Sequence, residues 1–395
     1  MSKVITILVI LCCLVGCIGK EEIDDLAMVM SFAIDKNEEN NNLIITAQIA
    51  RPGNVTGDTG GGGEGEPIWT ATSEGETIFE AIRNLARFSS RRVFWAHNFI
   101  IVVSEKVARE DGLVDIIDFF NRNNELRMRT WVVISEKDAR ELVATKTGLE
   151  IVPGMSLDRL FRYSDIVSEA PRSDVMTLTS AYLGEHTHPY LAMVNIRDRG
   201  INTESPEEFG SIPQVELSGT AIFKDDKMVG KLTAEESRGF LWFIDKIESA
   251  IVPLSCPEQN DRRTSVELRE NKFNISPYIE NDTVKFEATV KTKPHLVELG
   301  CLTSKEHSEI VTILEEKVEA AIIQDIEIML AKVQKEFKSD VLQLGRTFEG
   351  KYPGQWKEME SSWDDIYPNV EVKISVKSDI KNTLLLENPT RPAKD

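Results

Sequence analysis

The chain has 395 residues, and a single hydrophobic core rarely grows past about 250–300 residues, so two or three domains are expected. Sixty-five acidic residues against 46 basic ones give a formal charge of −19, which argues against a broad nucleic-acid-binding face. Apolar residues make up 41% and charged residues 28% of the chain, a composition that excludes a disordered chain and a polytopic membrane protein.

The first seventeen residues predict a lipoprotein. Lys3 precedes an apolar run from Val4 to Val15, which is too short to span a bilayer of about 30 Å as a helix. The run ends in Leu-Val-Gly-Cys, which has the form of a bacterial lipobox with a small residue before the cysteine. We therefore expect residues 1–16 to be a lipoprotein signal peptide and Cys17 to carry the lipid, with an ordinary signal peptide and a chance cysteine as the alternative.

This processing decides the fate of the five cysteines. Cleavage discards Cys12 and Cys13 and uses Cys17, so Cys256 and Cys301 remain. They are able to pair outside the cell, but two free buried thiols are the favoured interpretation. Loss of Lys3 changes the formal charge to −20, and an anionic membrane repels such a body, so attachment has to come from the acyl chains.

Residues 17–200 are predicted to form an N-terminal α/β domain. Strands are expected over 27–34 and 43–50, followed by a glycine-rich surface loop over 51–66 that lacks the Gly-Lys-Ser/Thr ending of a phosphate loop. Two similar stretches, Phe99–Arg109 and Trp131–Arg140, each run from a strand into a serine in N-cap position, as βα units of a mixed sheet would. Duplication and convergent capping explain this similarity equally well.

A capping box of Ser73 and Glu76 predicts the start of the first helix. That helix would place Arg83, Arg87 and Arg91 at i, i+4 and i+8 on the face opposite its apolar stripe. In so acidic a protein, these arginines are candidates for docking a carboxylate-rich partner or lipid headgroups, although a solvated helix face is the favoured interpretation.

Two further modules complete an α+β fold of three modules with mixed or antiparallel sheets flanked by helices. Residues 201–262 predict a middle domain of a hairpin plus a helix, and a second capping box starts that helix at Thr233. Residues 263–395 predict a C-terminal domain in which a long helix over 304–341 packs on a sheet. Its apolar positions step mostly by four residues, so it should bury a wide arc.

The sequence offers little for catalysis. It has no Gly-x-Ser-x-Gly, and neither Cys256 nor Cys301 lies in a nucleophile context. His186 and His188 have no third metal ligand close in sequence. We therefore expect a protein that is not an enzyme and needs no cofactor or metal.

Three groups of residues are distinctive: Glu22–Ala27 and Ile34–Lys36 behind Cys17, then Gly219–Lys224 with Gly230, Leu232, Glu236–Gly239 and Trp242, and last Ser339–Asp340 with Leu344–Gly345, Tyr352–Trp356 and Trp363. In these stretches the chain resembles the spore germination protein C family. The likeness runs from Cys17 to about Asn388 and keeps its order and spacing. Ile18 stands where the family often has Trp, which leaves the subtype open.

This resemblance implies a non-enzymatic lipoprotein subunit of a nutrient germinant receptor on the outer face of the spore inner membrane. It would assemble with two integral-membrane subunits, one of them transporter-like, and only Cys17 transfers as a functional residue. The alternative is an extracytoplasmic solute-binding lipoprotein, which would repeat βα units in two lobes. A cell-wall-lytic lipoprotein would need a metal or carboxylate site that the sequence does not offer.

Overall fold

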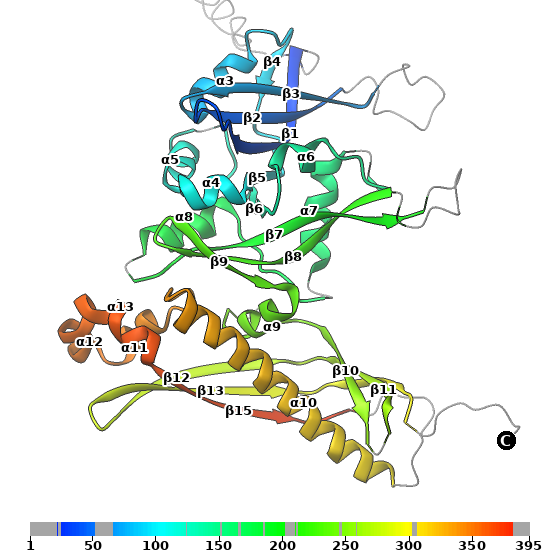
Figure 1. The fold of residues 1–395 in the computed structure, drawn as a ribbon, viewed down its shortest axis with the longest axis vertical. Coiled ribbons are helices and arrows are strands. Elements are labelled where there is room, and N and C mark those ends of the chain that lie inside the picture. Colours follow the sequence, from blue (N-terminus) through cyan, green and yellow to red (C-terminus); the bar gives the residue numbers. More distant parts are fainter. Residues whose placement is uncertain are drawn as a thin grey trace, which may run out of the picture.

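The structure is a computed structural model that describes residues 22, 25–51, 66–123, 125–150, 152–164, 167–184, 186–201, 210, 212–244, 247–257, 259–301 and 306–381. Within these residues the elements form three sheets and their covering helices, which confirms the predicted α+β class. The molecule is elongated, with the first strands at one end and the last sheet and its long helix at the other (Figure 1).

The first sheet has nine strands in the order β3-β2-β1-β5-β6-β7-β8-β9, with β4 also paired to β1. β1, β4, β5, β6 and β7 run parallel to their neighbours in this group, and the pairs β1–β2, β2–β3, β7–β8 and β8–β9 are antiparallel. The mixed sheet predicted from the two βα stretches is thus confirmed. The strands are β1 (Leu26–Lys36), β2 (Leu43–Ala50), β3 (Ile68–Gly75), β4 (Arg92–Phe94), β5 (Ile100–Ser104), β6 (Trp131–Ser135), β7 (Tyr190–Gly200), β8 (Ile212–Lys224) and β9 (Lys227–Thr233).

Helices cover both faces of this sheet, which is why β5 is buried along its whole length. Ile101 and Val103 of β5 belong to one apolar cluster, whereas the alternate residues Ile100 and Val102 belong to another on the opposite face. The first cluster includes residues of α3, α4, α5 and α8, and the second includes residues of α6 and α7. These helices are α3 (Ile78–Leu85), α4 (Glu105–Glu110), α5 (Val114–Arg122), α6 (Ala139–Ala144), α7 (Pro153–Tyr163) and α8 (Val175–Leu183).

The hairpin expected in a separate middle domain belongs to this first sheet. β8 pairs with β7 along most of its length, so the boundary expected at residue 200 falls between two paired strands. The helix that follows, α9 (Ala234–Phe243), begins at the predicted capping box, in which Thr233 and Glu236 each hydrogen-bond the other's backbone N–H.

The other two sheets have three strands each, in the orders β10-β11-β14 and β12-β13-β15. Their strands are β10 (Ala250–Cys256), β11 (Gln259–Leu268), β12 (Lys272–Glu280), β13 (Thr283–Thr292), β14 (His295–Leu299) and β15 (Glu371–Ser378). The predicted long helix is present as α10 (His307–Leu330), continued by the π-helix η3 (Ala331–Glu336), and it packs on the last sheet. Its four-residue stripe is buried as expected, at Ile310, Leu314, Val318, Ile322 and Ile326.

Short helices close the C-terminal part, and a disulfide holds its second sheet. The short helices are α11 (Leu344–Lys351), α12 (Pro353–Met359), η4 (Glu360–Ser362), α13 (Trp363–Ile366) and η5 (Tyr367–Asn369). The expectation of two free thiols is wrong, because Cys256 at the end of β10 is bonded to Cys301 just beyond β14. β11 pairs with both of these strands, which brings the two cysteines to the same end of that sheet.

Candidate functional site

Cys17 and residues 1–16 lie outside the described residues, as does the glycine-rich stretch 52–65, so the predicted lipidation stays a prediction. Asp25, immediately before β1, follows Cys17 by only eight positions, which places the expected anchor close in sequence to the first sheet. In the part of the chain that the structure describes, no helix has the length and apolar character needed to cross a bilayer.

The arginines predicted as one helical stripe do not share a helix. Ser73 belongs to β3, a strand that the sequence analysis missed, so the predicted capping box is wrong. α3 begins instead at Thr77, whose hydroxyl accepts the N–H of Glu80 at 3.2 Å, and it ends at Leu85. Arg83 therefore lies on α3, whereas Arg87 lies in the following turn and Arg91 in a bend just before β4.

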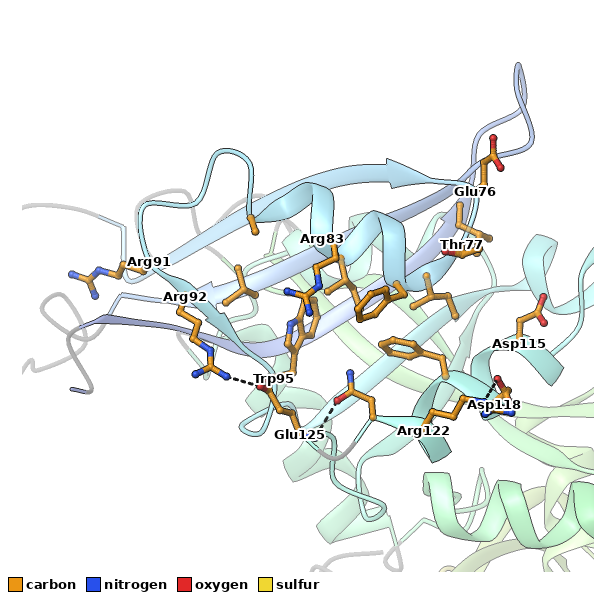
Figure 2. A pocket seen from close by; sticks show the side chains of 18 residues that line it. Glu76, Thr77, Arg83, Arg91, Arg92, Trp95, Asp115, Asp118, Arg122 and Glu125 are labelled. Atoms are coloured by element: carbon orange, nitrogen blue, oxygen red, sulfur yellow. Dashed lines mark hydrogen bonds and ion pairs between the residues drawn. The ribbon is translucent and has the colours of Figure 1, made fainter. Parts of the chain in front are cut away.

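Arg83 and Arg91 nevertheless border one cavity of about 730 Å³ between α3, α5 and β4. Trp95, Phe119 and Phe79 supply apolar walls, while Arg92 and Arg122 add two more guanidinium groups. Figure 2 shows Arg91 at the outer margin, directed away from the other labelled side chains, and Arg92 directed at Glu125. Arg87 does not line the cavity, so the structure brings together two of the three predicted arginines there.

Carboxylates neutralise part of this positive charge. Arg92 contacts Glu125 at 2.8 Å, and Arg122 contacts Asp118 at 2.8 Å. The hydrogen bond from Arg122 lowers the pKa of Asp118 below its ordinary value, so this carboxylate stays ionised at neutral pH. Arg83 lies 4.9 Å from the centroid of the Phe79 ring as a cation–π pair. The cavity thus offers paired and unpaired guanidinium groups beside aromatic rings, a setting suited to an anion with an apolar part.

The two histidines that come close in sequence have separate structural partners. The Nε2 atom of His186 lies 3.0 Å from Glu360, and its ring packs edge-on against Trp356. His188 is buried and accepts the backbone N–H of Asp225 at Nδ1, and burial lowers its pKa below the ordinary value. His186 therefore joins the segment before β7 to the C-terminal helices, whereas His188 supports the turn between β8 and β9. Across the described ranges, no three His, Cys, Asp or Glu side chains are grouped as metal ligands would be.

In the first of the stretches that carry the family resemblance, two residues of β1 anchor helices to that strand. Asp35 accepts the backbone N–H groups of Ala139 and Arg140 at 2.8 and 2.9 Å, so a carboxylate far away in sequence caps α6. Burial raises the pKa of Asp35, and the two N–H donors oppose that effect. Lys36 contacts Asp111, next to the end of α4, at 2.6 Å. The sequence alone does not reveal these roles of Asp35 and Lys36.

The second stretch that carries the family resemblance includes α9 and joins this helix to α10. Arg238 makes two hydrogen bonds to Asp325, at 2.6 and 3.1 Å, and Lys332 contacts Glu236 at 2.8 Å. A Cβ atom on Gly239 would lie 2.3 Å from the carbonyl oxygen of Asp325, so only glycine permits this approach of the two helices. These residues have a packing role.

The last stretch that carries the family resemblance organises the group of short C-terminal helices. Asp340 is buried and accepts the N–H groups of Leu344 and Gly345 and the indole N–H of Trp363, at 2.9, 2.8 and 2.9 Å. Ser339 donates a hydrogen bond to the carbonyl of Phe223 in β8, which ties this group of helices to the first sheet. None of the residues in the three stretches lines the cavity beside α3.

Comparison with known proteins matches two family models in order along the chain. The first, a spore germination protein N-terminal domain, matches residues 19–196, and the second, described as spore germination B3/GerAC like, C-terminal, matches residues 218–384. The first match ends within β7 and the second begins within β8, and these two strands pair in one sheet.

Relatives from Bacillus subtilis align over nearly their whole length. Spore germination protein KC is 26% identical over 385 residues, covering 95% of this chain and 94% of the relative. Spore germination protein B3 is 23% identical over 393 residues, covering 96% and 97%. The crystal structure of the GerBC protein superposes with a TM-score of 0.56 at 20% identity, covering 91% of this chain and 99% of that one, which shows a shared fold. The two ordered family matches and the full-length relatives together show that the chain belongs to the spore germination protein C family.

Proposed function

We propose that this chain is the lipoprotein subunit of a nutrient germinant receptor, tethered through Cys17 to the outer face of the spore inner membrane. The observation that carries the proposal is the order of features along the sequence. A lipobox ends at Cys17, and two spore germination family matches follow from residue 19 to residue 384. A diacyl anchor holds a protein stably at a bilayer, where a single chain is marginal.

In this proposal the protein acts through its partners and not through catalysis. It assembles with two integral-membrane receptor subunits, one of them transporter-like, and confinement to the same membrane raises its effective concentration over them. The residues that carry the family resemblance support this view. Asp35, Arg238 and Asp340, for example, hold helices and sheets together through hydrogen bonds. Capture of two multi-pass proteins with this chain from spore membranes would support the assembly, and its recovery alone would contradict it.

The tether is tested by Cys17→Ala. Mass spectrometry of the wild-type protein should find a mature N-terminus at Cys17 carrying a diacylglyceryl group. The variant should lose this group completely, and nutrient-triggered germination should fall to the level of a strain that lacks the chain.

A matched control is the double substitution Cys12→Ala and Cys13→Ala, because both cysteines lie in the predicted signal peptide. This control should keep the lipid on Cys17 and germinate normally. A wild-type chain whose Cys17 carries no lipid would contradict the proposed tether. Release of spore contents in response to germination stimuli that bypass nutrient receptors should be unchanged in both variants.

A further inference from the structure

The chain enters the first sheet at one defined end of that sheet. Leu26, the first residue of β1, pairs with Arg92 of β4, and Met28 pairs with Ala50 at the end of β2. Ala50 in turn pairs with Ile68 at the start of β3. The start of β1, the end of β2, the start of β3 and strand β4 therefore lie together.

Positive charge collects at this end, although the whole molecule is acidic. Arg51 directly follows β2, while Arg87 and Arg91 lie between α3 and β4, and all three side chains are exposed. In the described part of the chain, none of the three has a carboxylate partner, whereas neighbouring Arg92 is bound to Glu125. Three uncompensated guanidinium groups at one end of a body of formal charge −19 make that end distinct.

An exposed aromatic side chain accompanies these arginines. Phe88 follows Arg87 directly and is 53% exposed. Its ring packs edge-on against Trp69 of β3, with 6.1 Å between the ring centroids. We call Arg51, Arg87, Phe88 and Arg91 the anchor-end surface. Cationic groups that flank exposed aromatic rings are typical of surfaces that lie in the interface of a bilayer.

The length of the tether limits how far this surface can stand from the membrane. The eight steps from Cys17 to Asp25 span at most roughly 29 Å when fully extended. An anionic bilayer attracts arginines near its surface and repels the rest of the acidic body, and this attraction falls off within a Debye length of about 8–10 Å. Tether length and charge therefore favour the same orientation.

We propose that the anchor-end surface lies on the anionic phospholipid headgroups of the membrane to which the chain is tethered. This inference rests on the proposed lipid tether at Cys17. Arg51, Arg87 and Arg91 contact headgroup phosphates, Phe88 enters the interface, and the C-terminal sheet points away from the bilayer (Figure 1). Each arginine near an anionic surface contributes on the order of fivefold in surface affinity.

The test uses the full mature lipoprotein in vesicles of phosphatidylcholine alone or with 30% phosphatidylglycerol (a composition of roughly physiological charge). Hydrogen exchange measured by mass spectrometry follows peptides that cover residues 84–93. Exchange should be several-fold slower on phosphatidylglycerol vesicles than on neutral ones at low salt. The difference should vanish in high salt, and in Arg87→Glu/Arg91→Glu at any salt.

The matched control is Arg346→Glu/Lys357→Glu, which makes the same charge change at two exposed positions in α11 and α12, far from β1 (Figure 1). This control should keep the full effect of phosphatidylglycerol. Equal exchange on both kinds of vesicle would overturn the proposal. The proposal would also be overturned if, on neutral vesicles, exchange were slower in the wild type than in Arg87→Glu/Arg91→Glu. The acidic stretch Glu21–Asp25 would then be the partner of the arginines. Slowing by inorganic phosphate in detergent micelles would likewise exclude the membrane as the specific occupant.

Flotation separates this inference from the tether. Protein that carries no lipid on Cys17 and does not float with neutral vesicles contradicts the proposed function. In that case, salt-sensitive flotation with phosphatidylglycerol vesicles still supports the headgroup contact, and its absence overturns the contact as well.

Discussion

Asp340 illustrates how one buried carboxylate organises several elements. It accepts three N–H groups and so connects the start of α11 to Trp363 of α13. Burial raises its pKa from the ordinary 3.8 to about 6, and the hydrogen bonds from Gly345, Leu344 and Trp363 oppose that rise. Between these two values the folded protein binds more protons than the unfolded chain.

Stability should therefore fall as the pH rises from about 4 to about 6, by about 3 kcal/mol for this group. Asp340→Asn cannot titrate, so the difference in unfolding free energy between wild type and this variant should shift by about that amount between pH 4 and pH 7. Chemical unfolding at several pH values measures it. A difference that stays constant with pH would show that the carboxylate titrates normally.

Caps of this kind mark a limit of prediction from single residues. Ser104 and Thr233 cap the helices that follow them directly, as predicted, whereas the predicted cap at Ser135 is wrong because α6 begins only at Ala139. Asp35 caps α6 from 104 positions away in sequence. No local sequence pattern predicts this contact, because it forms only when the sheet brings β1 close to α6. Arg92 on β4 and Arg122 on α5 were missed for the same reason, since they border one cavity only because β4 and α5 fold near α3.

At the level of elements, α9 packs closely against α10 at Gly239. Gly239→Ala places a methyl group against the carbonyl of Asp325, and overpacking of this kind costs about 1–3 kcal/mol, more than the gain in helix propensity. Gly350→Ala in α11 is the matched control, because nothing lies within 4 Å of its added Cβ. Thermal unfolding should show a lower midpoint for the first variant and an unchanged or higher one for the second. Equal midpoints would mean that the helices separate without cost.

The spacing of apolar residues predicted the elements with a continuous apolar pattern. It missed elements in which polar residues interrupt that pattern. β2 begins and ends where expected, and the stripe of α10 is buried as expected. β3 contains the polar residues Thr70, Thr72 and Ser73, and the spacing of Ser73 and Glu76 matches a capping box although Ser73 lies in the strand. The end of α3 at Leu85 was missed because the arginines beyond it continue a helical spacing.

At the level of the whole molecule, strand pairing decides which segments belong together. Three sheets and a long helix were predicted, but β8 and β9 extend the first sheet, and β10, β11 and β14 form the second. Such pairings join strands that are distant in sequence, so the pattern within each strand does not reveal them. The Cys256–Cys301 bond was not the favoured prediction, because only the pairing of β11 with both β10 and β14 brings the two cysteines together.

Removing that bond gives a further prediction. The two cysteines are 45 positions apart, and closing a loop of this length stabilises the folded state by up to about 4 kcal/mol. Cys256→Ser/Cys301→Ser should therefore accelerate amide exchange in β10 and β11, while β1 and β5 in the first sheet exchange as in the wild type. Titration of two free thiols in the unfolded, unreduced mature wild-type protein would contradict the disulfide.

The parallel pairing of β13 with β15 has a consequence for the order of events during synthesis of the chain. β15 is supplied by Glu371–Ser378, close to the end of the chain, and β13 ends at Thr292, well before α10 begins. The last sheet can be completed only after nearly the entire polypeptide has been synthesised, whereas every strand of the first sheet has been synthesised by Thr233. The end of the molecule that holds β1 therefore has all its strands before the opposite end receives its last one.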